Sequence, residues 1–313
     1  MALRRDRPLS FKDAIETAQI ILSSSQALVE KGTIESEAIQ LVQAAYRSAT
    51  NRELSRLDLF TQLRESFPAA AGDRLLILAT TRAEGKPLQH LVGYQTFLDH
   101  EYEVGPDVLI PRPETEGLVV LVQDYLLTFD ARSILGIEVG VGSGAISIEL
   151  LASYSSLRMT ASDLQPHAIA RAHKNADRIL GTGAHRLALV QAQSVNEVFE
   201  PFLLYASGAY RNQVDFIVSN PPYLSQADSI EDEVRYFEPV SALYAPESDL
   251  LYFYRKIAQG AAQILKPGGA IFLEIPHERA DLIQHLFRSS PWCTSKIHFD
   301  LAGRPRVLVA SLA

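Results

Sequence analysis

The chain has 313 residues and a formal net charge of −8 at pH 7. Its 47% hydrophobic and 21% charged residues are ordinary for a globular protein, which excludes collagen-like and intrinsically disordered chains. A single cysteine, Cys293, cannot form an intrachain disulfide, which favours a reducing compartment. No apolar run approaches the roughly 18–20 residues that cross a bilayer, so we expect a cytosolic protein with no membrane partner.

The acidic excess lies after residue 91, while the first 91 residues are nearly balanced in charge. A bulk acidic surface repels phosphate backbones, which makes free duplex DNA a poor default partner. We therefore expect no direct binding of nucleic acid.

Helical periodicity dominates the first 91 residues. Ser10 can cap a helix in which Ala14, Ala18 and Leu22 recur on one face. Two interpretations of a domain over residues 1–91 stay open: a bundle that only stabilises its neighbour, and a module that docks a macromolecular substrate. Further helices are predicted at 34–50, 52–67 and 71–82.

A change to alternating apolar and polar residues marks the next segment, 92–112. Phe97, Tyr102 and Val104 follow this alternation, and Gly105-Pro106 provides a turn. The pattern predicts a β-hairpin that links two domains. Two prolines in the following segment, 111–116, hold the chain extended before a helix.

Apolar strands alternate with helical segments over residues 113–313. This alternation predicts an α/β domain with a parallel sheet covered on both faces. A terminal antiparallel hairpin is expected over 296–310, and an irregular insertion over 201–213. The predicted strands are 134–139, 157–162, 187–191, 216–219 and 270–274, and the predicted helices are 145–153, 166–180, 250–265 and 278–288.

A glycine-rich segment, Glu138–Ala145, joins the first parallel strand to a helix. Glycines there permit positive φ and close approach of a ligand to the backbone. The loop by itself fits NAD, another adenosyl cofactor, or a purely structural turn. Glu138 favours a cofactor with an ammonium group, and Asp163, at the end of the second strand, can accept hydrogen bonds from ribose hydroxyls or cap the next helix.

The sequence Asn-Pro-Pro-Tyr at 220–223 follows the fourth strand. Two prolines stop a central strand and stiffen the loop at the edge already assigned to the cofactor. Asn220 and the proline backbone offer carbonyl acceptors, and Tyr223 offers an aromatic surface. Such acceptors can orient a planar –NH2 group, whose lone pair is otherwise delocalised, toward an electrophile.

These motifs resemble the class I S-adenosylmethionine-dependent methyltransferases that modify planar nitrogens, and more narrowly the release-factor glutamine N5-methyltransferases. The likeness runs from about Pro87 to the C-terminus. It implies a seven-stranded Rossmann-like sheet over 113–313, with a helical domain over 1–91 that docks the substrate. The segments that carry it are Pro-Leu-Gln-His at 87–90, Leu-Ile-Pro-Arg-Pro-Glu-Thr-Glu at 109–116, Arg-Tyr-Phe-Glu-Pro at 235–239 and Asp-Leu-Ala-Gly-Arg at 300–304.

The resemblance implies methyl transfer from S-adenosylmethionine, without a metal, to the glutamine of the Gly-Gly-Gln motif in class I peptide-chain release factors. It implies catalytic roles for Asn220, Pro221 and Tyr223, and substrate contacts from these residues with Pro222, Phe97 and Arg112. Arg112 has the alternative of pairing with a nearby carboxylate. The implied cofactor residues are Glu138, Gly140, Val141, Gly142, Gly144, Asp163, Gln193 and Asn220.

Three positions depart from the family pattern: Glu138 replaces the usual Asp, Gln193 replaces an acidic residue near the adenine, and the segment 274–277 replaces Glu-x-Gly. Two alternatives to the glutamine substrate stay open. One is a methyltransferase of adenine N6 or guanine N2 in nucleic acid, and the other is a binding module without turnover. We expect a monomer, in a bacterial-type cytoplasm or in an organellar matrix.

Overall fold

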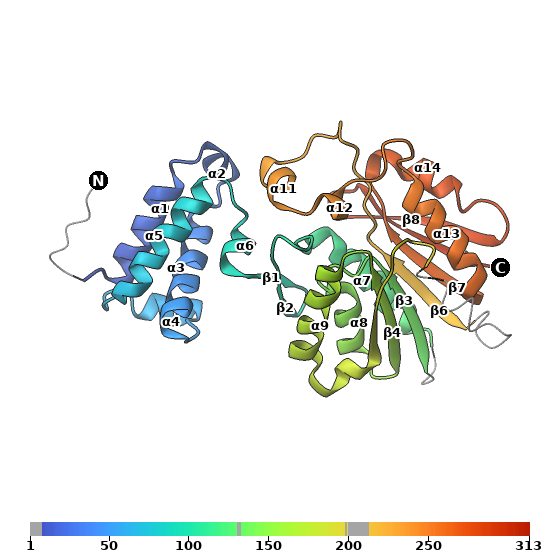
Figure 1. Ribbon diagram of the computed structural model, residues 1–313, viewed down its shortest axis with the longest axis horizontal. Coiled ribbons are helices and arrows are strands. Elements are labelled where there is room, and N and C mark those ends of the chain that lie inside the picture. The colour runs from blue at the N-terminus through green and yellow to red at the C-terminus, as the bar shows by residue number, and fades with distance from the viewer. Residues whose placement is uncertain (1–7, 130–132, 198, 200–212) are drawn as a thin grey trace. The chain divides into compact units, whose positions relative to one another are not determined.

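The computed structural model describes residues 8–129, 133–197, 199 and 213–313 (Figure 1). The predicted insertion at 201–213 therefore lies, except for Gln213, outside the described residues. The chain forms two compact units. Unit 1 comprises the residues up to Gly93 together with Ile230–Phe237, and unit 2 comprises Tyr94–Ser229 and Glu238–Ala313.

Unit 1 is helical, and a capping box sets the start of its first helix. The Ser10 side chain accepts a hydrogen bond from the Asp13 backbone N–H, and Asp13 accepts one from the Ser10 backbone, so the predicted cap is confirmed. Ala14, Ala18 and Leu22 are buried as the spacing predicts. The helices are α1 Phe11–Leu22, α2 Gln26–Lys31, α3 Ile34–Thr50, α4 Arg56–Thr61, α5 Ala69–Ala83, α6 Leu88–Val92 and α11 Asp232–Phe237.

The helix α4 is shorter than the helix predicted over 52–67. Ser55 accepts a hydrogen bond from the Asp58 backbone at 3.0 Å and so fixes the first turn after Ser55. The apolar residues on either side of the helix belong to the core of unit 1 without being helical. Periodicity alone does not separate a short helix from apolar loop residues that pack beside it.

The short helix α11 packs within unit 1, although its sequence lies far along the chain among the elements of unit 2. Arg82, only 3% exposed, makes two hydrogen bonds to the Glu37 carboxylate and one, at 2.7 Å, to Glu233 of α11. Lys31 also contacts Glu233, at 2.7 Å. Burial opposes ionisation of Glu233, but the two cations prevail and lower its pKa to about 2. Ion pairing thus attaches α11 to the bundle, a feature that the sequence analysis did not anticipate.

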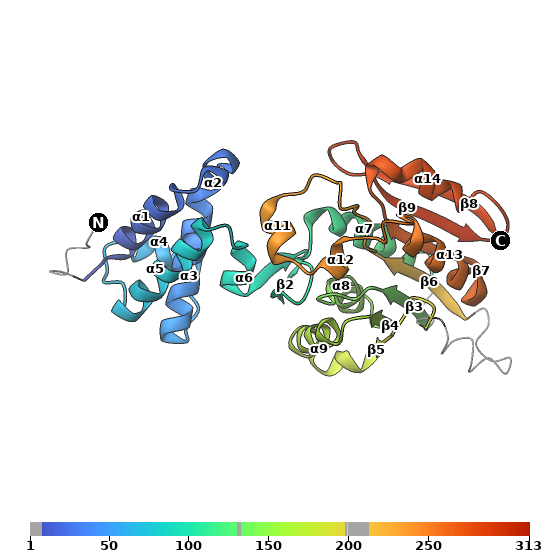
Figure 2. The same ribbon diagram turned by 45° about the horizontal axis from the view of Figure 1, so that its top comes forward.

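Unit 2 contains a two-stranded hairpin and a larger α/β layer structure (Figures 1 and 2). Short 3₁₀ helices occur at Gly181–Arg186 and His277–Arg279. The strands are β1 Tyr94–Phe97, β2 His100–Glu103, β3 Ile134–Val139, β4 Leu157–Asp163, β5 Leu187–Gln191, β6 Val214–Ser219, β7 Leu265–Glu274, β8 Trp292–Phe299 and β9 Pro305–Leu312, and the helices are α7 Pro113–Leu126, α8 Ala145–Ser153, α9 Pro166–Leu180, α12 Val240–Leu243, α13 Tyr252–Ile264 and α14 Ala280–His285.

Within the described ranges, seven strands form one sheet in the order β5-β4-β3-β6-β7-β9-β8. β3 pairs in parallel with β4 on one side and with β6 on the other, while β9 runs antiparallel to both β7 and β8. This is the expected α/β sheet with its terminal antiparallel hairpin. The strand order reverses between β3 and β6, which places the switch point of the sheet beside the glycine-rich segment.

Both faces of the sheet are covered, as the continuous apolar strands predict. Side chains of α7, α8 and α9 pack with Phe216 and Val218 of β6 on one face. Side chains of α13 and α14 pack with Val214 and Ile217 of the same strand on the other. Figure 2 shows these two helical layers on opposite sides of the strands. The predicted helix over 278–288 is a 3₁₀ turn followed by the short α14, Ala280–His285.

The position of the predicted turn in the linking hairpin was wrong. The hairpin pairs Tyr94 with Glu103 and Phe97 with His100, so the chain turns at Leu98-Asp99 and not at Gly105-Pro106. Leu98 has φ +47°, and its backbone N–H donates to the Glu116 carboxylate at 3.1 Å. A tertiary contact thus supports a tight turn that lacks the usual glycine. In the part of the chain that the structure describes, no helix is long and apolar enough to cross a membrane.

We expect Arg82→Met to destabilise unit 1 by about 3–5 kcal/mol, because it leaves the Glu37 and Glu233 carboxylates without their buried cation. Hydrogen exchange at the amides of α3 and α5 measures this loss. The control is Lys12→Met, which removes an exposed pair with Glu16 at 3.5 Å and should cost no more than about 0.5 kcal/mol. Equal protection in the two variants would contradict the role given to Arg82.

Candidate functional site

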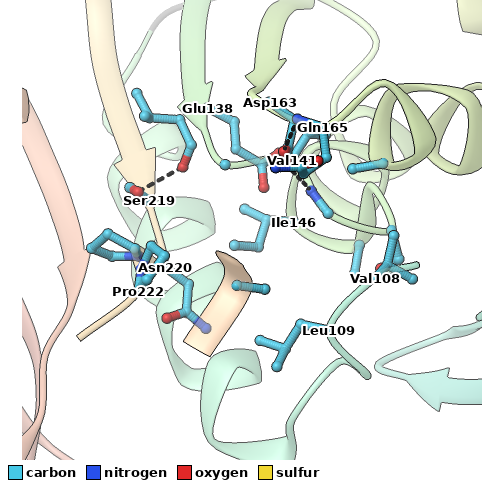
Figure 3. A pocket seen from close by; sticks show the side chains of 18 of the residues that line it. Val108, Leu109, Glu138, Val141, Ile146, Asp163, Gln165, Ser219, Asn220 and Pro222 are labelled. Carbon is cyan, nitrogen blue, oxygen red and sulfur yellow. Dashed lines mark hydrogen bonds between the residues drawn. The ribbon is translucent and has the colours of Figure 1, made fainter. Parts of the chain in front are cut away.

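An open cavity in unit 2 lies at the carboxyl ends of β3, β4 and β6 (Figure 3). Its empty space, counted with the open mouth, is about 1100 Å³. Figure 3 shows Glu138 and Asp163 toward one side of this space and Ser219, Asn220 and Pro222 toward another. The predicted site residues that line it are Phe97, Arg112, Glu138, Gly140, Val141, Gly142, Asp163, Asn220, Pro221 and Pro222.

The glycine-rich loop curls back onto the end of β4. The backbone N–H groups of Gly140 and Val141 both donate to the Ser162 carbonyl at 2.8 Å. Gly140 has φ +82° and Gly142 has φ +52°, a region that side-chain-bearing residues rarely adopt. Gly144 is also in this region, but a Cβ there would lie 2.8 Å from Ile148, so this glycine serves close packing. Every residue of the segment except Gly144 lines the cavity.

Glu138 lies at the wall of the cavity but is only 1% exposed. The Ser147 backbone N–H donates to its carboxylate at 3.0 Å, and the Ser147 hydroxyl donates to the same oxygen. Burial nevertheless dominates and raises the pKa of Glu138 to about 8, with a contribution from the nearby Asp163 charge. A cationic ligand group beside this carboxyl would favour its ionised form.

Asp163 lines the same wall and is held by backbone donors. Its Oδ2 accepts from Gly142 N at 3.0 Å, and its Oδ1 accepts from Gln165 N at 2.9 Å. Gln165, and not Asp163, is the N-cap residue of α9, so the helix-capping alternative does not describe this side chain. Burial raises the pKa of Asp163, while the backbone N–H groups oppose that shift. Each oxygen keeps a lone pair for a ligand hydroxyl.

The Asn-Pro-Pro-Tyr segment leaves β6 opposite the glycine-rich loop. Ser219, the last residue of the strand, donates from its hydroxyl to the Val139 carbonyl at 2.6 Å and so joins the ends of β6 and β3. Pro221 is buried and Asn220 is half-buried, and both line the cavity. This arrangement sets the Asn220 carboxamide at the same opening as the two acidic residues.

The side chain of Asn220 is fixed by two residues for which the sequence analysis proposed no role. Its Nδ2 donates to the Thr115 hydroxyl at 3.2 Å, and Thr115 donates to the Glu274 carboxylate at 2.6 Å. Burial raises the pKa of Glu274 to about 7. The available signal was the Pro-Arg-Pro-Glu-Thr-Glu segment, which contains Thr115, together with a glutamate at the end of an apolar strand.

Arg112 pairs with a carboxylate, as its alternative interpretation held, and it also lines the cavity. Its partner is Glu238, whose other oxygen accepts from the Ile110 backbone N–H at 3.1 Å. Glu238 is the first residue of unit 2 after the α11 segment. The segments at 109–116 and 235–239 therefore meet at one buried carboxylate.

Three predicted site residues do not line the cavity: Gly144, Gln193 and Tyr223. Gln193 is exposed, and its backbone N–H donates to Glu197 at 2.7 Å. Tyr223 packs beside the core, and the Arg279 guanidinium donates to its backbone carbonyl at 3.2 Å. Burial raises the pKa of the Tyr223 hydroxyl, so the side chain stays neutral at ordinary pH.

Apolar side chains also contribute to the wall, among them Phe97, Leu109, Ile146 and Val195. Phe97 is held edge-on against Tyr102, with ring centroids 6.1 Å apart. Apolar walls with acidic groups at one end suit a planar aromatic body that carries hydroxyl and cationic groups. The Asn220 carboxamide lines the same cavity.

Proteins named release factor glutamine methyltransferase are similar to this chain over most of its length. The one from Koribacter versatilis is 33% identical, covering 81% of this chain and 85% of that protein. The one from Streptococcus pneumoniae is 32% identical, covering 88% of this chain and 90% of that protein. A methyltransferase structure from Pyrococcus furiosus aligns with a TM-score of 0.45 at 17% identity, covering 69% of this chain and 90% of that one. No family model matches the chain.

The raised pKa of Glu138 predicts that the ligand-free protein loses stability as the pH rises. Between the ordinary pKa of 4.5 and the folded value of about 8, the folded state keeps a proton that the unfolded chain has released. The ionisation of Glu138 therefore costs the folded state nothing below pH 4.5. Between pH 4.5 and about pH 8 it lowers the free energy of unfolding by at most about 1.4 kcal/mol per pH unit. Urea unfolding at several pH values measures it.

The matched variant is Glu138→Gln, which keeps an acceptor for Ser147 but cannot ionise. Its stability should depend less on pH than that of the unchanged protein. Glu16→Gln, at an exposed position of α1, should leave the pH dependence as it is. An identical pH profile for Glu138→Gln and the unchanged protein would mean that Glu138 is not buried in its neutral form.

Proposed function

The chain belongs to the family of release factor glutamine methyltransferases, and on this premise we propose a donor and an acceptor for its methyl transfer. The proposed donor is S-adenosylmethionine, which becomes S-adenosylhomocysteine. The proposed acceptor is the side-chain amide nitrogen, N5, of the glutamine in the Gly-Gly-Gln motif of class I peptide-chain release factors. The observation that carries the proposal is that Asn220 and Pro221 line the same cavity as Glu138 and Asp163.

The donor site is proposed at the wall formed by β3 and β4. Asp163 would accept hydrogen bonds from the ribose hydroxyls, and Glu138 would hold the ammonium group of the amino-acid part. Gly140 and Gly142 would let the ligand approach the backbone closely. When bound, S-adenosylmethionine supplies an electrophilic methyl group on a sulfonium centre. Gln193 lies outside this wall and is not included in the proposal.

The acceptor site is proposed at the Asn220–Pro221 corner. An amide nitrogen is a weak nucleophile because its lone pair is delocalised into the carbonyl group. Carbonyl oxygens of Asn220 and Pro221 would accept hydrogen bonds from the two N–H groups of the glutamine amide, orient its nitrogen, and stabilise the positive charge that develops there until one of the two protons is released to water. Phe97 and Arg112 would shape the opening through which the side chain enters. Tyr223 would support the corner from the core side.

Unit 1 is proposed as the module that docks the release factor, in the cytoplasm where translation takes place. Its core is complete by itself, with Phe11, Leu41 and Leu75 all at most 2% exposed. A bundle that needs no further burial for its own stability keeps its outer surface available for a partner. The same amino-binding corner would also suit an exocyclic amine of adenine or guanine, which is the second substrate class to test.

Incubation with radiolabelled S-adenosylmethionine should place label on a purified class I release factor. Replacing the Gly-Gly-Gln glutamine of the substrate with alanine should abolish the label, because the accepting nitrogen is then absent. DNA and RNA included in parallel reactions should stay unlabelled. Label on nucleic acid alone would select an exocyclic-amine methyltransferase, and cofactor binding without transfer would select a binding module.

Replacing Asn220 with alanine should lower turnover at least about a hundredfold, the scale of one lost transition-state contact. The dissociation constant for S-adenosylmethionine should change by no more than a few-fold, since the proposed donor contacts lie on β3 and β4. The control is Gln259→Ala, which removes an exposed amide on α13. Single-turnover kinetics and calorimetric titration measure the two quantities, and unchanged turnover in Asn220→Ala would refute the role of Asn220.

A further inference from the structure

A buried chain of hydrogen bonds runs from the end of β7 to the side chain of Asn220. Glu274, the last residue of β7, is 2% exposed and accepts the Thr115 hydroxyl proton at 2.6 Å. Thr115, in the first turn of α7, is 5% exposed and accepts from Asn220 Nδ2 at 3.2 Å. Three segments far apart in sequence thus meet through two hydrogen bonds.

The donor and acceptor capacities in this chain settle which way the Asn220 amide faces. Above the Glu274 pKa of about 7 its carboxylate is ionised and can only accept, so Thr115 then uses its single hydroxyl proton toward Glu274. The Thr115 oxygen then has only lone pairs to offer. It can hold the NH2 side of the Asn220 carboxamide but not its carbonyl side. The carbonyl oxygen of Asn220 is consequently the end left for a ligand.

Thr115 and Glu274 together form a relay to Asn220, and both residues are themselves held in place. The Thr115 backbone N–H donates to the Arg112 carbonyl at 3.0 Å, and Arg112 is bound by the buried Glu238. The Glu274 carbonyl accepts from the Tyr254 hydroxyl at 3.0 Å. A hydroxyl at the third residue of a helix is not needed for capping, and the Thr115 hydroxyl makes no bond to the backbone of α7 in the described contacts. Its two bonds run only toward Glu274 and Asn220.

We propose that Thr115 and Glu274 are positioning residues that keep the Asn220 carbonyl oxygen directed to the incoming amino group. This inference rests on the proposed glutamine N5 methyl transfer. An unrestrained Asn220 would present its NH2 group part of the time. An Asn220 NH2 group that faces the NH2 group of the substrate amide opposes binding, because two hydrogen-bond donors meet. Turnover therefore depends on an acceptor that the relay orients before the substrate arrives.

The key variant is Thr115→Val, which has nearly the same shape but lacks the hydroxyl. We expect kcat to fall about tenfold or more, the effect of roughly one lost hydrogen bond in free energy. The matched control, Thr115→Ser, keeps the hydroxyl and should stay within about threefold of the unchanged protein. Assays at pH 8.5 keep Glu274 ionised, since this pH lies above the pKa of about 7 that its burial produces.

A double-mutant cycle with Asn220→Ala separates positioning from general support of the structure. If Thr115 acts through Asn220, then adding Thr115→Val to Asn220→Ala should lower kcat by less than about twofold. The dissociation constant for S-adenosylmethionine and the melting temperature of each variant are measured alongside. A structural defect would move these quantities and would lower kcat in both backgrounds.

The outcomes separate failure of the relay from failure of the proposed function. If the unchanged protein does not label the release factor, the proposed function fails and the relay fails with it. If the unchanged protein labels it, and Thr115→Val is as active as Thr115→Ser, only the relay is refuted. The relay is likewise refuted if Thr115→Val lowers kcat by the same factor in the unchanged protein and in the Asn220→Ala variant. The relay is supported if Thr115→Val lowers kcat only in the protein that retains Asn220 and leaves the dissociation constant for S-adenosylmethionine unchanged.

Discussion

Parallel pairing of β3 with β4 and β6 is the constraint on which the rest of the site depends. Parallel strands end at the same edge of a sheet, so residues that follow them in sequence converge in space. Glu138, Asp163 and Asn220 are separated by tens of residues along the chain, yet they line one cavity at this edge. The reversal of strand order between β3 and β6 opens the space that they share.

Buried carboxyl groups then give this edge its rigidity. Glu138 is held by Ser147, Glu238 binds Arg112 and the Ile110 backbone, and Glu274 binds Thr115. Each of these contacts joins two segments that are distant in sequence or belong to different elements. A carboxyl group removed from water requires donors, so the fold that buries it also specifies the position of its partner.

The α11 segment links the two units a second time along the chain. The chain leaves unit 2 at Ser229, contributes α11 to unit 1, and returns at Glu238, the residue that binds Arg112. Backbone hydrogen bonds between Leu224 and the segment at 243–245 close the base of this excursion. The chain therefore passes from one unit to the other three times, after Gly93, after Ser229 and after Phe237.

Local sequence signals determined several helices and strands of both units and the conformation of the glycine-rich loop. The strand at 134–139, the helices at 145–153 and 166–180, and the cap at Ser10 follow from apolar periodicity, prolines and capping residues, each of which acts within a few residues. The glycines at 140 and 142 likewise indicate positive φ, because glycine adopts this conformation without steric cost. The hairpin turn escaped prediction because Leu98 is supported by Glu116, a contact outside its own segment.

Only the tertiary structure decided which side chains meet. The Glu274–Thr115–Asn220 chain, the pairing of Arg112 with Glu238, and the attachment of α11 through Arg82 all join positions more than a hundred residues apart. A residue's type shows that it needs a donor or an acceptor, but not which one the fold supplies. That choice is made when burial removes water as the alternative partner, and burial is a property of the assembled chain.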